Sequence, residues 1–127
     1  MPLVRITLRK GLTPALLHDA SQVVHHALVA TANVPADDLF HILEEVEPHQ
    51  IVAHPTYGGV EPRSERLVIV QITLNAGRTV EVKKALYAAI AAGLSAALGI
   101  RTDDVLINLV EVTKENWSFG KGLATYA

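Results

Sequence analysis

The chain has 127 residues, a formal net charge of −2 at pH 7, 50% hydrophobic and 19% charged residues, and no cysteine. This length fits one domain with its own hydrophobic core, the lack of cysteine excludes disulfides and thiolate metal sites, and the charge balance gives no basic footprint for nucleic acid. No apolar run approaches the roughly 18 residues of a membrane span and no signal-peptide pattern opens the chain, so we expect one cytoplasmic domain over residues 1–127 with neither nucleic-acid nor membrane partners.

The first half of the chain predicts a strand, a helix and a second strand. An apolar run over 2–9 is typical of a strand, and apolar residues at helical spacing predict a helix over 14–32. Thr13 followed by Pro14 is an N-cap with proline at the first helical position. Another apolar run predicts a strand over 38–46, and the Pro- and Gly-rich segment 47–65 predicts a loop.

The second half repeats this order at an offset of 66 residues. Its predicted elements are a strand over 66–74, a helix over 80–97 that starts at Thr79 and stops at Gly99, and a strand over 104–112. Residues 6–13 and 72–79 are identical at five of eight positions, and further matches recur downstream at the same offset. The pattern indicates a duplicated βαβ unit, with repeats at about 2–46 and 66–112 and a C-terminal tail from 114.

The duplication predicts an α+β fold. Right-handed crossovers place both helices on one face of a four-stranded sheet and leave the other face uncovered. The continuous apolar runs 67–70 and 105–107 are typical of strands buried on both faces, and the mean hydropathy of +0.28 is high for a small soluble protein. We therefore expect the uncovered face to contact other subunits of an oligomer.

Pro2 is the first candidate for chemistry, because removal of Met1 would leave a secondary amine at the start of a strand. An α-amino group titrates near ~7.7–8.0, a secondary amine starts somewhat higher, and an apolar pocket or a nearby arginine would lower its pKa toward neutrality. Its counterpart in the second repeat, Val68, has no free nitrogen. The alternative is that Pro2 reflects only the processing of the initiator methionine.

Arg78 is the second candidate, because it stands where the first repeat has Leu12, immediately before a helix. An arginine there can meet an anion at a helix N-terminus, although a solvated surface charge is the alternative. The other arginines considered fit surface charges: Arg9, Arg63, Arg66 and Arg101.

The remaining polar and aromatic candidates are weaker from the residues alone. Asp38 beside Asp37 is expected in a turn or cap at a strand start. Trp117 and Phe119 either line an apolar pocket or pack. The six histidines lack metal-ligand spacing, His25 and His26 are expected on a helix without chemistry, and no nucleotide-binding motif occurs, so neither a metal nor a cofactor is expected.

Taken together, these features resemble the tautomerase superfamily over essentially the whole chain. The residues that carry the resemblance are Pro2 heading a strand, the doubled βαβ unit, Asn75-Ala76-Gly77-Arg78-Thr79, and Asn116-Trp117-Ser118-Phe119-Gly120. Within that superfamily the chain is most similar to the malonate semialdehyde decarboxylase-like group. The resemblance implies a cofactor-free enzyme, a homotrimer, a catalytic Pro2, an Arg78 that binds the substrate carboxylate, and a participating Asp38.

Three functions stay open at this level. The first is keto–enol tautomerisation of a small 2-oxo or 3-oxo carboxylic acid, with Pro2 as acid and base, Asn75 hydrogen-bonding the enolate oxygen, and Trp117 and Phe119 as apolar wall. The second is a cofactor-free decarboxylase or hydratase using Asp38; against it, Asn75 and Ala76 stand where that group is expected to have a second arginine. The third is a non-catalytic oligomeric binding protein.

Overall fold

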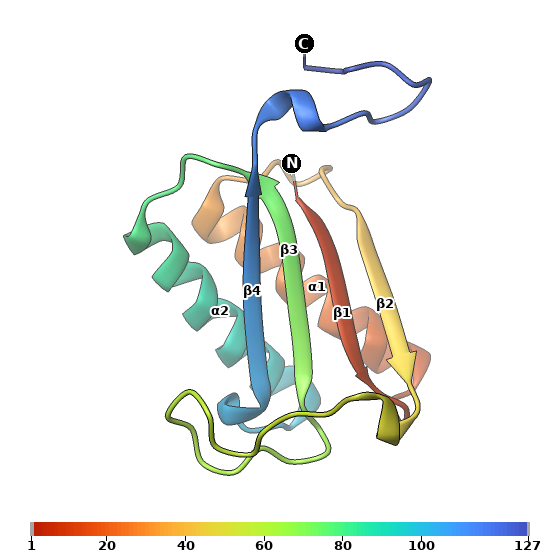
Figure 1. Cartoon of the computed structure of the whole chain (residues 1–127), viewed down its shortest axis with the longest axis vertical. Helices are drawn as coiled ribbons and strands as arrows, with labels where there is room; N and C mark the ends of the chain where they lie inside the picture. The colour runs from red at the N-terminus through yellow and green to blue at the C-terminus, as the bar shows by residue number, and fades with distance from the viewer. Residues whose placement is uncertain (1, 127) are drawn as a thin grey trace.

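The computed structural model describes residues 2–126 as two layers, a sheet and a pair of helices (Figure 1). The regular elements in chain order are β1 (Leu3–Arg9), α1 (Pro14–Ala32), β2 (His41–Val46), β3 (Val68–Asn75), α2 (Val80–Leu98) and β4 (Val105–Val112). Three short 3₁₀ helices follow or precede strands, at Pro48–Gln50, Thr102–Asp104 and Lys114–Asn116.

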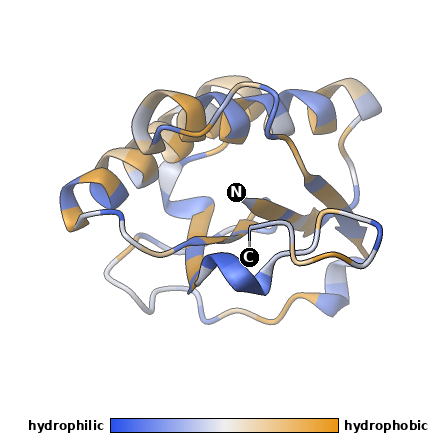
Figure 2. Cartoon of the chain, turned by 90° about the horizontal axis from the view of Figure 1, so that it is seen from above, coloured by the Kyte–Doolittle hydropathy of each residue, from blue (hydrophilic) through white to orange (hydrophobic). Residues whose placement is uncertain are grey.

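The four strands form one sheet in the order β2-β1-β3-β4. β1 pairs parallel with β2, β3 pairs parallel with β4, and the two halves meet through the antiparallel pair β1 and β3. Both helices lie on the same side of the sheet, as the view from above shows (Figure 2). The predicted duplicated βαβ architecture is therefore confirmed.

The two repeats match in their helix boundaries as well as in their order. Each helix has 19 residues, and the starts at Pro14 and Val80 differ by the predicted 66 positions. Both helices are capped in the same way, since the side chains of Thr13 and Thr79 each accept a backbone N–H three residues on at 3.2 Å. The strand-to-helix turns need glycine in both halves, because the backbone at Gly11 and Gly77 has φ of 138° and 125°.

All four strands begin later than the sequence predicts, β1 and β4 by one residue and β2 and β3 by two or three. The strand expected from 38 begins at His41, because Asp37 and Asp38 close a turn in which the Asp38 N–H bonds to Pro35 O at 3.0 Å. The strand expected from 66 begins at Val68. In both places the apolar pattern extends into a turn that precedes the ladder.

The core lies between the sheet and the helices. Every second residue of β1 and β3 faces the helices and is buried, as at Val4, Ile6, Ile72 and Leu74. The opposite face is open in the single chain, and its apolar side chains include half-exposed ones at Leu3, Ile42, Leu106 and Val110. The continuous apolar runs therefore have one face available for another subunit.

Arg9, at the end of β1, ties the long connection between the repeats to the sheet. Arg9 donates to three backbone carbonyls, those of Pro48 at 2.8 Å, Ile51 at 2.8 Å and Glu65 at 3.2 Å. The 3₁₀ helices Pro48–Gln50 and Lys114–Asn116 also differ by 66 positions. The connection after β2 and the tail after β4 thus both begin with a 3₁₀ helix. The similarity of the two halves therefore extends past the predicted repeat bounds at 46 and 112.

The two helices pack closely at Gly93, and a side chain there should be destabilising. A Cβ on Gly93 would lie 2.5 Å from Val23 Cγ1, and the β-branched valine has little rotamer freedom in a helix. The clash, about 1–3 kcal/mol, should exceed the roughly 1 kcal/mol that alanine gains over glycine in a helix. We expect Gly93→Ala to lower the free energy of unfolding by about 1 kcal/mol in urea titrations.

Val23→Ala provides the matched background for this test, because it removes the γ carbons that the new methyl would meet. In that background Gly93→Ala should be neutral or stabilising. An equal loss of stability in both backgrounds would show that the helix contact is not the cause.

Candidate functional site

The candidate residues gather at one end of the sheet, where β1 begins and β3 ends. Pro2 is buried and directly precedes β1, whose Leu3 pairs with Thr73 of β3. The turn that carries Asn75 and Arg78 follows at once, and the C-terminal tail crosses the same end (Figure 1). The structure therefore brings together segments that lie more than 100 residues apart in the chain.

The guanidinium of Arg78 is fixed by backbone carbonyls. Its Nε and Nη2 donate to Ala32 O, the last carbonyl of α1, at 3.1 and 2.9 Å, and its Nη1 donates to Asn75 O at 3.1 Å. A cation is favourable at a helix C-terminus. Three of the five N–H donors of the side chain are used in these bonds, which leaves two for a carboxylate.

Asn75 is oriented by the tail. Trp117 Nε1 donates to Asn75 Oδ1 at 2.7 Å across 42 residues of sequence. An indole N–H is only a donor, so the amide atom that faces it must be the oxygen. The NH₂ group of Asn75 is consequently the part of the amide that is turned away from the indole.

An aromatic stack stands beside this pair. The rings of Trp117 and Phe119 are stacked with centroids 5.9 Å apart, and Phe40 continues the stack at 6.3 Å from Phe119. Tyr126 meets the edge of Phe119 at 5.3 Å. Two further rings, from the residue before β2 and from the end of the tail, thus adjoin Trp117 and Phe119.

Asp38 lies in the turn before β2, at the same end of the sheet as Pro2. Val4 N bonds to Phe40 O at 3.0 Å, which ties this turn to the beginning of β1. From α1, the buried His25 donates through Nε2 to Ala36 O at 2.8 Å. The segment that carries Asp38 is therefore held from two sides.

Glu111 and Lys83 form an ion pair near Arg78, with Nζ and Oε1 2.8 Å apart. The hydrogen bond from Lys83 lowers the pKa of Glu111, and the Gly77 N–H and the charge of Arg78 act in the same direction. Glu111 thus stays ionised and contributes negative charge near the guanidinium of Arg78.

His41 predicts an acid-sensitive fold. Burial, and secondarily the neighbouring His25, lower the pKa of His41 to about 4, and its Nδ1 lies 2.8 Å from Ser21 Oγ. The unfolded chain takes up a proton near pH 6.5 that the folded chain refuses until about pH 4. The free energy of unfolding should therefore fall by about 1–2 kcal/mol as the pH falls from 6.5 to 4, after discounting for the half-exposed ring.

Urea denaturation at several pH values checks this expectation. His41→Asn should remove most of the fall in stability between pH 6.5 and 4, whereas His18→Gln, which replaces an exposed histidine of α1, should keep it. A fall of the same size in His41→Asn would assign the acid sensitivity to other groups.

Several residues carry more structure than the sequence suggests. Arg9 and Arg66, at the opposite end of the sheet, are predicted as surface charges, and their guanidinium groups also bind backbone carbonyls. At the Pro2 end, His25, expected on its helix without chemistry, binds the carbonyl of Ala36 in the loop that follows α1. Phe40 joins the aromatic stack without having been singled out. These contacts join segments that are distant in the sequence, so local patterns do not predict them. The 66-residue offset is the one available signal, because it shows that the ends of the two helices are equivalent.

No group of three or more His, Asp or Glu side chains in residues 2–126 is arranged to hold a metal ion. Neither long helix in that range has the length and hydropathy needed to cross a membrane.

Comparison with known proteins identifies the family. A family model described as a tautomerase enzyme matches residues 38–120, and a second model with the same description matches residues 2–60. The probable tautomerase YusQ of Bacillus subtilis (strain 168) is 40% identical over 124 residues, which cover 98% of this chain and 97% of YusQ. The probable tautomerase YrdN of the same strain is 30% identical over 99% of this chain and 96% of YrdN.

Solved structures agree in fold over the whole length. The FG41 malonate semialdehyde decarboxylase inhibited by 3-bromopropiolate superposes with a TM-score of 0.91 at 36% identity, covering 98% of this chain and 93% of the other. Another malonate semialdehyde decarboxylase, with decarboxylase and hydratase activities, gives 0.89 at 31% identity over 98% and 95%. A wild-type symmetric trimer of fused 4-OT gives 0.81 at 29% identity over 98% and 97%. This chain is thus a tautomerase-superfamily enzyme related to the malonate semialdehyde decarboxylases.

Proposed function

We propose that this enzyme interconverts the enol and keto forms of a small 2-oxo or 3-oxo carboxylic acid, with the amine of Pro2 as acid and base once Met1 has been removed. The observation that carries the proposal is that Pro2, at the start of β1, and Asn75 and Arg78, at the end of β3 and in the turn after it, lie at the same end of the sheet. Met1 itself lies outside the described residues.

Each group has one task in the proposed reaction. Arg78, fixed by Ala32 O, binds the carboxylate through its two remaining donors. The amine of Pro2 accepts the proton of the enol hydroxyl while the oxygen's electron pair forms the carbonyl, and the resulting ammonium returns the proton to carbon. The NH₂ of Asn75 hydrogen-bonds the oxygen as negative charge develops on it.

The aromatic stack supplies the low-polarity wall of this site. Desolvation by Trp117 and Phe119 disfavours the charged form of an amine and so keeps a base near neutrality. Because the indole of Trp117 also orients Asn75, one side chain serves both the wall and the oxygen site.

A ¹⁵N NMR pH titration of proline-labelled protein tests the proposal directly. Only a terminal proline amine titrates, since every other proline nitrogen is an amide. Intact mass first establishes that Met1 is absent from the sample. An amine with a pKa below the ~7.7 of an ordinary terminus supports a general base, whereas no titrating amine in protein lacking Met1 would contradict the mechanism.

A second candidate is cofactor-free decarboxylation or hydration, favoured by the two decarboxylase structures and by the placement of Asp38 in a turn held at the Pro2 end. In this reaction Asp38 orients a water or the substrate carbonyl and a cationic Pro2 acts as acid. An amine pKa above roughly 9 and loss of decarboxylase activity in Asp38→Asn would favour it. If Asp38→Asn kept tautomerase activity while it lost decarboxylase activity, the two reactions would be shown to use different residues.

We propose a homotrimer as the working form. The open face of the sheet carries apolar side chains that include Ile42, Leu106 and Val110, and the fused 4-OT relative is a trimer. Light scattering coupled to size-exclusion chromatography gives the mass in solution. Mass of a single chain at micromolar concentration would contradict this assembly.

A further inference from the structure

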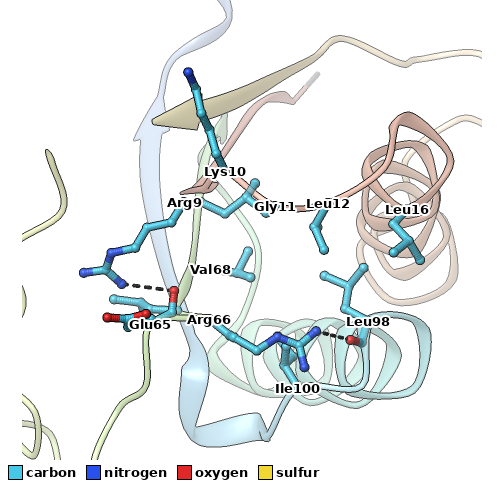
Figure 3. A pocket seen from close by; sticks show the side chains of 12 residues that line it. Arg9, Lys10, Gly11, Leu12, Leu16, Glu65, Arg66, Val68, Leu98 and Ile100 are labelled. Carbon is cyan, nitrogen blue, oxygen red and sulfur yellow. Dashed lines mark hydrogen bonds between the residues drawn. The ribbon is translucent and has the colours of Figure 1, made fainter. Parts of the chain in front are cut away.

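A cavity of about 410 Å³ lies at the opposite end of the sheet, and none of the six candidate site residues lines it. Its walls come from the end of β1, the start of β3, the beginning of α1 and the end of α2 (Figure 3). At the 66-residue offset, these wall positions correspond to positions of the other repeat that lie at the Pro2 end. Val68 takes the place of Pro2, Gly11 that of Gly77, and Leu12 that of Arg78.

At each end of the sheet an arginine guanidinium binds the carbonyl of the last residue of a helix. Arg66 donates to Leu98 O at 2.5 Å and to Gly99 O at 3.2 Å. Leu98 and Ala32 correspond under the offset, so Arg66 caps α2 as Arg78 caps α1, although the two arginines occupy non-equivalent positions of the sequence. Each end of the molecule therefore has a fixed cation beside an apolar wall.

The cavity carries positive charge that the protein does not neutralise. Within residues 2–126, neither Arg9 nor Arg66 takes part in an ion pair; both are held by carbonyl oxygens. Arg9 keeps two of its five donors and Arg66 keeps three outside these bonds. Lys10 is instead paired with Glu47 and points away from the hollow in Figure 3. One acidic side chain, Glu65, lies at the mouth.

The interior of the cavity is apolar. Leucine, valine and isoleucine side chains from both layers line it: Leu12, Leu16, Leu67, Val68, Leu98 and Ile100. The Arg66 side chain runs beside this apolar wall to Leu98, whereas the Arg9 side chain is directed away from Leu12, Leu16 and Leu98 (Figure 3). An apolar chamber with one cation at its edge matches a compact acid with a hydrocarbon body, since such a ligand buries the body and pairs its charge. The volume is within the range of small-molecule sites.

We propose that this cavity is a second carboxylate site, which binds a small monocarboxylic acid with an apolar body and does not transform it. The nitrogen of Val68 is an amide within the chain, and Val68 lies between β1 and β4 in the ladder, so the site has no terminal amine to move a proton. Occupancy here is independent of the chemistry at Pro2, and the inference does not depend on the proposed reaction.

Benzoate is a suitable probe, because it has no α-hydrogen and cannot enolise. Methyl-labelled protein carrying Arg78→Gln, which weakens binding at the Pro2 end, is titrated with benzoate by NMR. We expect saturable shifts of the methyls of Leu12, Leu16 and Leu98, and no comparable shifts with neutral benzamide. Absence of these shifts, or equal shifts with benzamide, would overturn the proposal.

Three further variants in the same background identify the groups that bind. Arg66→Gln should weaken benzoate binding at least tenfold, Glu65→Gln should tighten it several-fold, and Leu16→Trp should block it by filling the chamber without altering charge. Unchanged affinity in all three would place benzoate elsewhere. In the Arg78-containing enzyme, Arg66→Gln and Leu16→Trp should retain kcat/KM, so failure of this site and failure of the Pro2 mechanism give different results.

Discussion

Replacement of Pro2 by alanine is expected to lower kcat/KM for ketonisation of the enol of phenylpyruvate by about a hundredfold. After removal of Met1, alanine leaves a primary amine in place of the secondary amine of proline, whose ring also fixes φ near −65°. Pro2 is buried against the end of the sheet, so a more mobile and differently basic amine loses both position and matched pKa. Positioned acid–base groups contribute about 10²–10⁴-fold to rate. Steady-state ultraviolet assays of both proteins measure the effect.

The control for this substitution is the state of the terminus. Both proteins must lack Met1 by intact mass and show the same far-ultraviolet circular dichroism. A protein extended by Gly-Ser before Pro2, in which the nitrogen is an amide, should lose more activity than Pro2→Ala. Full activity in either variant would remove Pro2 from the mechanism.

Arg78→Ala is expected to lower kcat/KM by about 10–100-fold or more, mainly through KM. The guanidinium is the cation that the carboxylate meets in the proposed reaction, and charge-assisted hydrogen bonds contribute about 1.5–3 kcal/mol. The same substitution also frees Ala32 O at the end of α1 and should reduce stability. Kinetics and urea denaturation therefore have to be measured together.

Arg66→Ala is the matched control, because Arg66 makes the equivalent contact with Leu98 O at the end of α2. It should lose stability as Arg78→Ala does and keep its catalytic constants. If both variants lost the same kcat/KM, the effect of Arg78 would be structural and its role in carboxylate binding would be refuted.

Most of the fold was predictable because the local signals agree with one another. Thr13-Pro14 and the helical spacing that follows place α1 at the predicted residues 14–32, and the offset of 66 carries the same assignment to α2. The starts of β2 and β3 were less predictable, since apolar residues continue into turns that only hydrogen bonds define. The helix caps depend only on residues three positions apart, which explains why the helix starts are accurate.

The site was less accessible to sequence reasoning because its parts meet through tertiary structure. Arg78 was predicted from its place before a helix, yet its guanidinium binds the end of the other helix, and nothing in the turn specifies Ala32 as partner. The bond between Trp117 and Asn75 joins the tail to β3 across 42 residues. The sequence around Arg66 did not indicate its contact with Leu98 O. At the 66-residue offset Arg66 would correspond to a position before Met1, so it has no counterpart in the first repeat.

The near two-fold relation between the halves means that the order of segments along the polymer, rather than the geometry of the sheet, would decide which end of the molecule receives an amine. The chain start and the tail lie at the same end of the sheet (Figure 1), so a circular permutant that joins them and opens at residue 68 is feasible. With Val68→Pro at its new beginning, such a permutant would present a prolyl amine to the cavity beside Arg66, while the nitrogen of Pro2 became an amide. The same fold would then carry its reactive group at the opposite pole.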